Sequence, residues 1–300
     1  MATTTTRDET TATTGQDGGV EQKPKSNLRL FFRGKFVWIP IIFFLIWTVG
    51  PLYWSAVASF KTRGDIYTLS WLPPTWTHAG YTTAVSLPGF ERFFFNSLYL
   101  AATSTIIAVF VSMLAAYAVS RYAFKFRHLL LLAVLLPRLV PRVSLIVPLF
   151  QILSDVNLLN TYTALIITYA ASNVPLGTWI LVGFFRGIPK EIEDAAMVDG
   201  ANTWQRLWRI VVPLTLPGLI TVGVLSFRDA WNEFPFILAF TTDATMRTLP
   251  YALFLINDTL GIPAWNVVNA FTLLTIIPIV VIFLLFERKV VAGLTSGAVK

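Results

Sequence analysis

Several residue types that support redox, metal or nucleophilic chemistry are missing or scarce in this 300-residue chain. It has no cysteine, which excludes disulfides, thiolate zinc sites and cysteine nucleophiles. Its two histidines, His78 and His128, stand alone in predicted connections, away from any cluster of His, Asp or Glu at metal-ligand spacing. No Ser-His-Asp set is suggested either. The sequence therefore predicts no catalytic residue, no metal site and no cofactor bound by this chain.

A phosphate-binding loop is also absent. The pattern G-x-x-x-x-G-K-[ST] occurs nowhere, since Gly34-Lys35 lacks the rest of it. The chain is therefore not expected to hydrolyse ATP by the usual route, and any use of ATP requires a separate polypeptide.

Charge is scarce as well. Charged residues make up 13% of the chain, whereas soluble domains carry roughly 25%. Long stretches contain no charge at all, and about 20 apolar residues are enough to cross the ~30 Å hydrocarbon core of a bilayer. The sequence predicts an all-α, polytopic membrane protein of about six transmembrane helices, the third and fifth of them interrupted by charge and proline. The predicted spans are 36–60, 93–119, 129–153, 161–184, 211–235 and 264–286.

The net charge of +7 reflects Lys and Arg in the short segments between apolar blocks, where they set topology rather than bind nucleic acid. With the N-terminus inside, the inner segments hold 15 of these residues and the outer segments 5, which predicts that both termini are cytoplasmic. Residues 1–27 form a Thr-, Gly- and Gln-rich tail that is expected to be disordered. The basic cluster after it precedes a full-length span, so 36–60 is interpreted as a retained signal-anchor.

The inner connection between spans four and five, residues 186–217, has the most informative local pattern: RGIPKEIEDAAMVDGANTWQRLWRIVVPLTLP. Pro189 suits the first turn of a helix, and the carboxylates that follow it suit the positive helix end. Gly200 is expected to end this helix in a left-handed conformation. Asn202 and Gln205 resemble a capping box that starts a second helix. The pattern predicts two short helices joined at a glycine on the inner membrane face.

This loop resembles the EAA loop of binding-protein-dependent ABC importer permeases. Asp194-Ala195-Ala196 is followed by Gly200, Ile210 and Pro213 at the spacing of that motif, with Asp194 in place of the usual Glu and Val212 in place of the usual Leu. The resemblance implies the MetI-like permease fold and a coupling helix that docks on a separate ATPase. The residues it assigns to this coupling are Glu193, Asp194, Ala195, Ala196, Asp199 and Gly200. A hairpin of no special role is the alternative.

Three further stretches resemble the six-helix permease of carbohydrate importers related to the maltose system. They are Phe95-Asn96-Ser97, Trp231-Asn232-Glu233-Phe234 and the final residues 293–300. The similarity covers roughly residues 30–300, which form the permease domain, taken as 28–300. In that family the end of the chain also contacts the ATPases, so the resemblance assigns such a contact to the cytoplasmic tail, residues 287–300, through Gly293, Thr295, Ser296 and Lys300.

Arg228 and four further charged residues fall inside predicted spans, where each costs about 2.5–3.5 kcal/mol at mid-membrane. Arg138 and Arg142 share one face of span three, and Asp229 and Glu233 share one face of span five, because each pair is spaced i,i+4. One hypothesis is that the two faces lie together along the translocation path or face a partner subunit. The alternative is that span three breaks at Pro137 and Pro141 and the arginines reach carbonyls or water there.

Sugar binding needs polar side chains beside aromatic faces. Asn96, Tyr99, Trp231, Asn232 and Glu233 are candidates for such a path, although aromatic residues at this depth also serve as interfacial anchors.

The family resemblance implies a permease subunit that imports a sugar (an oligosaccharide, a disaccharide or a polyol) by alternating access in a bacterial inner membrane. Another small solute is the alternative substrate within this class. It implies as partners two copies of an ABC ATPase that bind ATP and Mg, a second homologous permease and an extracytoplasmic solute-binding protein. A self-contained secondary transporter and a membrane-embedded enzyme are the alternatives. The first would show paired repeats with broken helices, and the second a cluster of catalytic residues, and neither is visible in the sequence.

Overall fold

The computed structural model describes residues 38–260 and 264–296, and within these ranges every regular element is a helix. The chain forms two compact units, residues 1–52 and 53–300. The predicted tail 1–27 lies outside the described residues. Four described helices are long and apolar enough to cross a membrane, and up to six spans result if each of two bent pairs counts as one. The expectation of about six transmembrane helices agrees with this architecture.

Four of the predicted spans are continuous helices. They are α2 (Trp38–Ser59), α4 (Phe90–Arg121), α7 (Tyr162–Arg186) and α14 (Trp265–Ser296). Each arises where a long apolar run can satisfy its backbone only within itself, as the hydrocarbon core requires. The side chain of Thr161 caps α7 by accepting a hydrogen bond from the Ala164 N–H.

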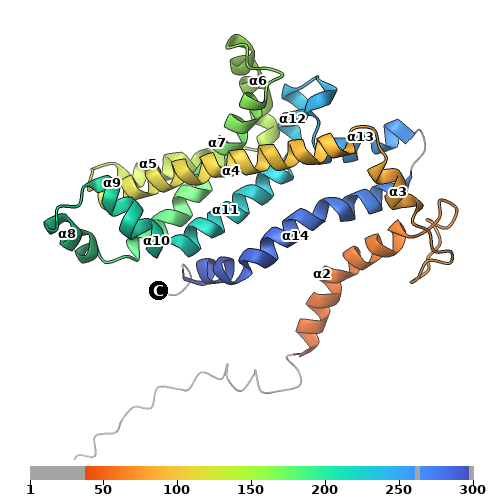
Figure 1. The fold of residues 1–300 in the computed structure, drawn as a ribbon, viewed down its shortest axis with the longest axis horizontal. Helices are drawn as coiled ribbons and strands as arrows, with labels where there is room; N and C mark the ends of the chain where they lie inside the picture. Colours follow the sequence, from red (N-terminus) through yellow and green to blue (C-terminus); the bar gives the residue numbers. More distant parts are fainter. Residues whose placement is uncertain (1–37, 261–263, 297–300) are drawn as a thin grey trace, which may run out of the picture. The chain divides into compact units, whose positions relative to one another are not determined.

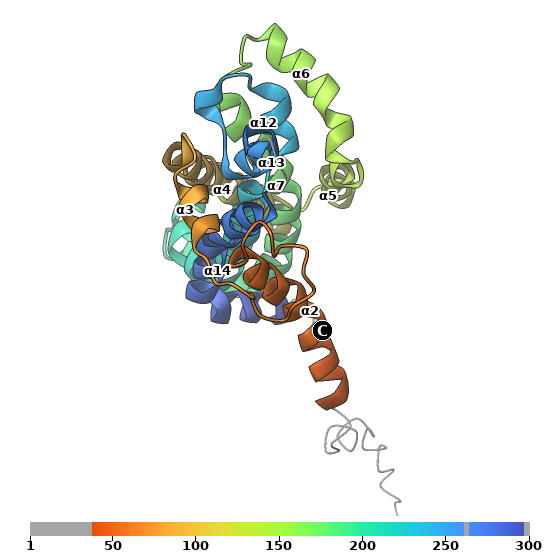
Figure 2. The same ribbon diagram turned by 90° about the vertical axis from the view of Figure 1, so that its right-hand side faces the viewer.

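The third predicted span is broken rather than continuous. It consists of α5 (Arg127–Leu135), two 3-10 turns (Leu136–Leu139 and Arg142–Leu145) and α6 (Ile146–Asp155), and its two halves are bent by 98°. Pro141 explains the position of the break, because a proline pushes the residue before it out of the helical region, and Val140 is extended. In Figures 1 and 2, α6 extends away from the rest of the bundle.

The fifth predicted span, 211–235, is likewise not one continuous helix. Its straight part is α11 (Leu216–Trp231), which is bent by 79° from the preceding helical segment, Thr203–Leu214. That segment contains α9 (Thr203–Arg206), a π-helical turn (Leu207–Val211) and α10 (Val212–Leu214). The prolines at 213 and 217 flank the bend, and proline is a usual cause of such kinks.

Short helices fill connections in which no helix was predicted. They are α3 (Ala79–Val85), α12 (Pro235–Phe240), a 3-10 turn (Ala244–Met246) and α13 (Leu249–Leu260). Together with the start of α14 they form one end of the bundle, which we call the α13 end. Helix α8 (Lys190–Val198) marks the opposite end, the α8 end (Figure 1).

The core is formed by α4, α7, α11 and α14 and divides into two buried clusters. One cluster lies at the α13 end around Trp231, Phe236 and Phe271. The other lies at the α8 end around Tyr117, Phe185 and Leu207. Among the four continuous spans, α7 has the largest buried share, so it forms the centre of the bundle.

Small residues allow these helices to approach closely, as expected in lipid. Ala101 and Ala116 of α4 and Ala170 of α7 are buried in this way. Gly177 of α7 marks the tightest contact, because a Cβ there would lie 2.5 Å from the Ser112 hydroxyl of α4 and 2.9 Å from Val222 of α11.

Candidate functional site

The loop predicted from the EAA pattern forms two helices joined at a glycine, as the sequence indicated. Helix α8 begins after Pro189, which is the N-cap rather than a residue of the first turn. It ends in a Schellman motif at Gly200, whose φ is +83°. The N–H of Gly200 donates to the Met197 carbonyl at 3.1 Å, and the N–H of Ala201 donates to the Ala196 carbonyl at 2.9 Å.

The predicted capping box is present as well. The Asn202 side chain accepts from the Gln205 N–H at 2.8 Å, and the Gln205 side chain accepts from the Asn202 N–H at 2.9 Å. Both ends of the turn are therefore fixed by their own residues, without help from the rest of the bundle.

Most of the predicted coupling residues lie on the surface of the α8 end. Asp194, Ala195, Asp199 and Gly200 are exposed, and Ala196 is half-buried. Exposed apolar side chains lie beside them, with Met197 54% and Val198 87% exposed. A small apolar surface next to carboxylates suits contact with a protein partner.

Glu193 departs from this expectation, because its side chain is 5% exposed and points into the bundle. Its Oε1 lies 2.5 Å from Nε of Arg121, and its Oε2 accepts a hydrogen bond from the Tyr117 hydroxyl at 2.9 Å. Both terminal nitrogens of Arg121 also donate to the carbonyl of Ile188, at 3.4 Å. Glu193 therefore attaches α8 to the end of α4.

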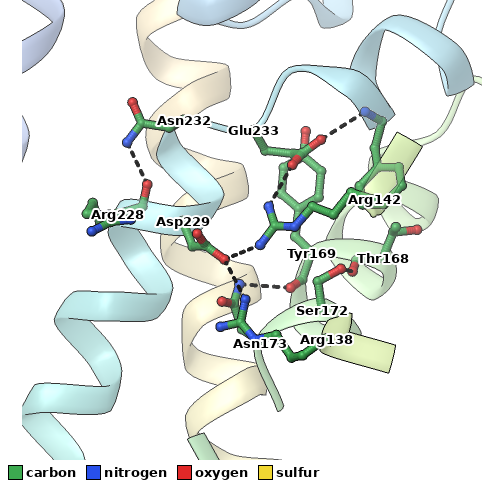
Figure 3. Close-up of polar contacts among 11 residues, drawn as sticks. Arg138, Arg142, Thr168, Tyr169, Ser172, Asn173, Arg228, Asp229, Asn232 and Glu233 are labelled. Atoms are coloured by element: carbon green, nitrogen blue, oxygen red, sulfur yellow. Dashed lines mark hydrogen bonds and ion pairs between the residues drawn. The ribbon is translucent and has the colours of Figure 1, made fainter. Parts of the chain in front are cut away.

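Arg138, Arg142, Asp229 and Glu233 come together, as one hypothesis from the sequence required (Figure 3). Arg142 donates to Glu233 at 3.0 Å and forms an ion pair with Asp229, and Arg138 lies 3.6 Å from Asp229. The break in span three, which was offered as an alternative, is also real. It places both arginines beside α11, where they contact the carboxylates of Asp229 and Glu233, whereas the alternative named carbonyls or water as their partners.

This charged cluster borders a shallow surface recess. Arg142, Asp229 and Glu233 line it together with Tyr169, Ser172, Asn173, Ala230 and Phe236. The Tyr169 side chain is buried, and its hydroxyl has no hydrogen-bond partner among the described residues. Glu233 is held on a second side by the Phe236 N–H, which donates to Oε1 at 2.8 Å.

The other candidates for a sugar path do not join this cluster. Asn96 is buried and fully engaged: its amide donates to the carbonyls of Thr245 and Arg247, and its oxygen accepts from Tyr162. Trp231 is 2% exposed and donates to the Thr275 carbonyl. Tyr99 and Asn232 are exposed, although the Asn232 amide donates to the carbonyl of Arg228 in its own helix.

The proposed tail contacts are only partly described. Gly293, Thr295 and Ser296 belong to the end of α14, and Lys300 lies outside the described residues. The expected tail 287–300 therefore begins as helix, since α14 continues without interruption to Ser296.

Sequence reasoning missed Tyr117 and Arg121 as functional candidates. Arg121 was assigned only to the count of inner charges, yet the two residues are spaced i,i+4 at the end of span two and share a helix face. That pair, next to a loop rich in carboxylates, was the available signal.

At the α13 end, Asn160 joins two connections. Its side-chain oxygen accepts from the N–H groups of Thr242 and Asp243. Hydrogen bonds from Thr245 hold the pKa of the nearby Asp243 carboxyl below its ordinary value.

A bundle of spanning helices that carries a short helix with the sequence Asp-Ala-Ala at one end is typical of the permease subunits of membrane transporters. The family model described as the binding-protein-dependent transport system inner membrane component matches residues 108–292. The chain belongs to this family and is a multi-pass membrane permease subunit.

Individual relatives are similar along most of their length. The chain is 38% identical to the sulfoquinovosyl glycerol transport system permease protein of Agrobacterium fabrum, over 91% of this chain and 96% of that one. It is 38% identical to the trehalose/maltose transport system permease protein of Thermococcus litoralis, over 83% of this chain and 91% of that one.

A solved structure has the same fold. It is a crystal structure of a bacterial ABC transporter involved in the import of the acidic polysaccharide alginate, with a TM-score of 0.73 at 18% identity. The match covers 89% of this chain and 98% of that chain. The MetI-like permease fold expected from the EAA pattern is therefore confirmed at the level of the ABC importer permease.

Proposed function

We propose that this chain is the permease subunit of an ATP-driven importer that moves a sugar or a sugar derivative into a bacterial cytoplasm by alternating access. The observation that carries the proposal is the exposed surface of α8, where Asp194 and Ala195 lie in a helix that ends in a Schellman motif at Gly200. A helix held this firmly transmits a push from a partner without rearranging itself.

The substrate class rests on relatives. Those named above carry sulfoquinovosyl glycerol and trehalose or maltose in their names, and a further relative is named for diacetylchitobiose uptake. All of these solutes contain sugar rings, which supports a carbohydrate as the solute of this chain too.

The partners proposed are two copies of an ABC ATPase, a second homologous permease and an extracytoplasmic solute-binding protein. ATP and Mg would bind to the ATPase, since this sequence contains no phosphate-binding loop. A related fold has been crystallised in a bacterial alginate ABC transporter in complex with a pentasaccharide-bound periplasmic protein, which supports the binding-protein partner.

The orientation follows from charge. The α8 end holds more of the Lys and Arg of the connections than the α13 end, so the α8 end and both termini would face the cytoplasm. The inner end of α14 would then reach the ATPases through Gly293, Thr295, Ser296 and Lys300.

In the solute path we place the charged cluster, Arg138, Arg142, Asp229 and Glu233, together with the exposed Tyr99 and Asn232. The charged groups neutralise one another in this conformation and leave little free space beside them. We therefore assign the structure to a state in which this part of the path is closed.

The experiment is co-expression with the candidate ATPase, second permease and binding protein, followed by purification and reconstitution in vesicles. The proposal expects all subunits to co-purify and vesicles to accumulate labelled sugar only with ATP and the binding protein. Bulky replacements such as Ala195→Trp should abolish both co-purification and accumulation. Transport by the lone chain, or an Ala195→Trp complex that assembles and accumulates sugar normally, would overturn the proposal.

A further inference from the structure

The side chain of Glu193, in the coupling loop, is buried against the helix bundle. Glu193 belongs to α8, but its carboxylate is buried against Tyr117 and Arg121 of α4. An ion pair removed from water in this way is costly to break, because the remaining charge would be left buried without a partner. Helices α8 and α4 are therefore attached to each other by polar contacts and not by apolar packing alone.

Helix α4 differs from the other long spans in its composition. Its 32 residues contain neither glycine nor proline, whereas Pro51, Pro175 and Pro278 interrupt α2, α7 and α14. Proline and glycine are the usual causes of helix kinks. Helix α4 is thus the long helix best suited to move as one rigid body over its whole length.

The opposite end of α4 also carries polar attachments. Asn96 donates to the carbonyls of Thr245 and Arg247 at 2.8 and 2.9 Å, and the Ser97 hydroxyl accepts from the Leu249 N–H at 2.9 Å. These bonds join α4 to the segment 245–249, which leads into α13. Figure 1 shows α4 running from the neighbourhood of α3 and α13 to that of α9.

We propose that Tyr117, Arg121 and Glu193 are positioning residues that make α8 and α4 move together, and that α4 carries this movement to the segment 245–249. This inference rests on the proposed function, because the movement of α8 would come from the ATPase. It adds a route by which ATP hydrolysis at one end changes the structure at the other. The contacts at both ends of α4 are the two points where that route can be interrupted.

The test uses the complete reconstituted complex and measures the ratio of sugar accumulated to ATP hydrolysed. Tyr117→Phe removes one hydroxyl and keeps the packing, and Glu193→Gln removes the charge. Both complexes should assemble and hydrolyse ATP, while the ratio falls by at least about five-fold, which is the usual lower range of coupling between sites. Glu191→Gln is the matched control, since Glu191 is exposed on the same helix.

A second pair of variants tests the rigidity of α4 without disturbing either end. Ile106 and Ile107 are 68% and 39% exposed in the middle of α4. The double change Ile106→Gly with Ile107→Gly softens the helix, since glycine is about 1 kcal/mol less favourable than alanine at each helical position. It should lower the ratio, whereas the same double change to alanine should not.

If Tyr117, Arg121 and Glu193 only stabilised the fold, the variants would behave differently. Transport and ATP hydrolysis would then fall in proportion, or the complex would fail to assemble, and either result in Tyr117→Phe overturns the inference. An unchanged ratio in Tyr117→Phe and in the double glycine variant overturns it too. In both cases a wild-type complex that accumulates sugar leaves the proposed function intact, whereas a wild-type chain that neither binds the ATPase nor transports sugar overturns the proposed function itself.

Discussion

At Gly200 the backbone has a φ of +83°, and an added Cβ would meet no atom within 4 Å. Space is therefore available for a side chain, and only the left-handed conformation opposes one. For residues other than glycine this conformation costs roughly 1–2 kcal/mol, and Asn tolerates it better than most. At this position, therefore, backbone strain and not steric crowding opposes a side chain.

Gly200→Val should disturb the turn between α8 and α9, and Gly200→Asn should largely preserve it. The expected difference of about 1–2 kcal/mol corresponds to roughly 5–30-fold in the population of the correctly ended helix. Co-purification of the ATPase with each variant, titrated at several ATPase concentrations, measures it. Equal loss of binding in the two variants would show that contact at the glycine surface, not backbone conformation, is what matters.

The same residues show what sequence can and cannot reveal. Gly200 and the Asn202–Gln205 capping box were predictable because their signals lie within a few neighbouring residues. The inward direction of Glu193 was not, because it depends on Arg121, 72 positions earlier in the chain. Contacts between residues so far apart in the chain produce no periodic pattern in the sequence.

Among the helices, α7 packs most closely through Gly177, where a Cβ would lie 2.5 Å from the Ser112 hydroxyl and 2.9 Å from Val222. Ser112 cannot turn away freely, since its hydroxyl also donates to the Val174 carbonyl at 3.1 Å. Gly183, two turns further along α7, has no atom within 4 Å of the corresponding position.

Gly177→Ala should therefore destabilise the bundle, whereas Gly183→Ala should have little effect or stabilise it slightly. Forcing an extra carbon into a packed contact costs about 1–3 kcal/mol. Thermal unfolding of the purified chain in detergent compares the two variants, which make the same chemical change in the same helix. A Gly183→Ala variant as unstable as Gly177→Ala would refute the close approach of α4, α7 and α11.

The broken third span is held beside α11 by charge. Glu233 is 3% exposed and Arg142 is 32% exposed at the side chain, so loss of the arginine leaves a buried carboxylate without its partner. Breaking a buried ion pair in this way costs about 3–5 kcal/mol, while replacing both partners by apolar residues is often neutral.

Arg142→Met should accordingly destabilise the protein strongly, and addition of Glu233→Met should restore part of the loss. Arg228→Met is the control, because Arg228 is an exposed arginine of α11 without an ion pair in the described part of the chain. Unfolding temperatures of these three variants and of the wild type test this order of stability, and the Glu233→Met single variant completes the double-mutant cycle that gives the coupling energy. The ion pairs would have no structural role if Arg142→Met were no less stable than Arg228→Met.

The helices that were predicted correctly are those for which the length of the apolar run alone identifies a membrane span. Spans 36–60, 93–119, 161–184 and 264–286 were recognisable because an uninterrupted apolar run of that length forms one helix in a bilayer. Helices α12 and α13 were not predicted, since short apolar segments in a connection carry no length signal. The bends near Pro141 and Pro217 were indicated by proline, but their angles depend on packing against neighbouring helices.

For the whole molecule, the distribution of charge predicts which end of the bundle faces the cytoplasm. The fold alone does not determine this orientation. The α8 end carries Arg186, Lys190, Arg206 and Arg209 within one connection, and the positive-inside rule therefore predicts that this end faces the cytoplasm. The ATPase that we propose as partner is a cytoplasmic protein, so the two ideas require the same orientation.

The lack of cysteine makes this orientation directly measurable, because any introduced cysteine is the only one in the chain. Glu191 in α8 and Ala244 at the α13 end are both exposed, and neither side chain forms a hydrogen bond or ion pair among the described contacts. A membrane-impermeant maleimide added to intact cells should label Ala244→Cys and leave Glu191→Cys unlabelled until the membrane is opened. The reverse pattern would place α8 on the outside, where no ATP-hydrolysing partner could reach it, and would remove the basis for coupling through this helix.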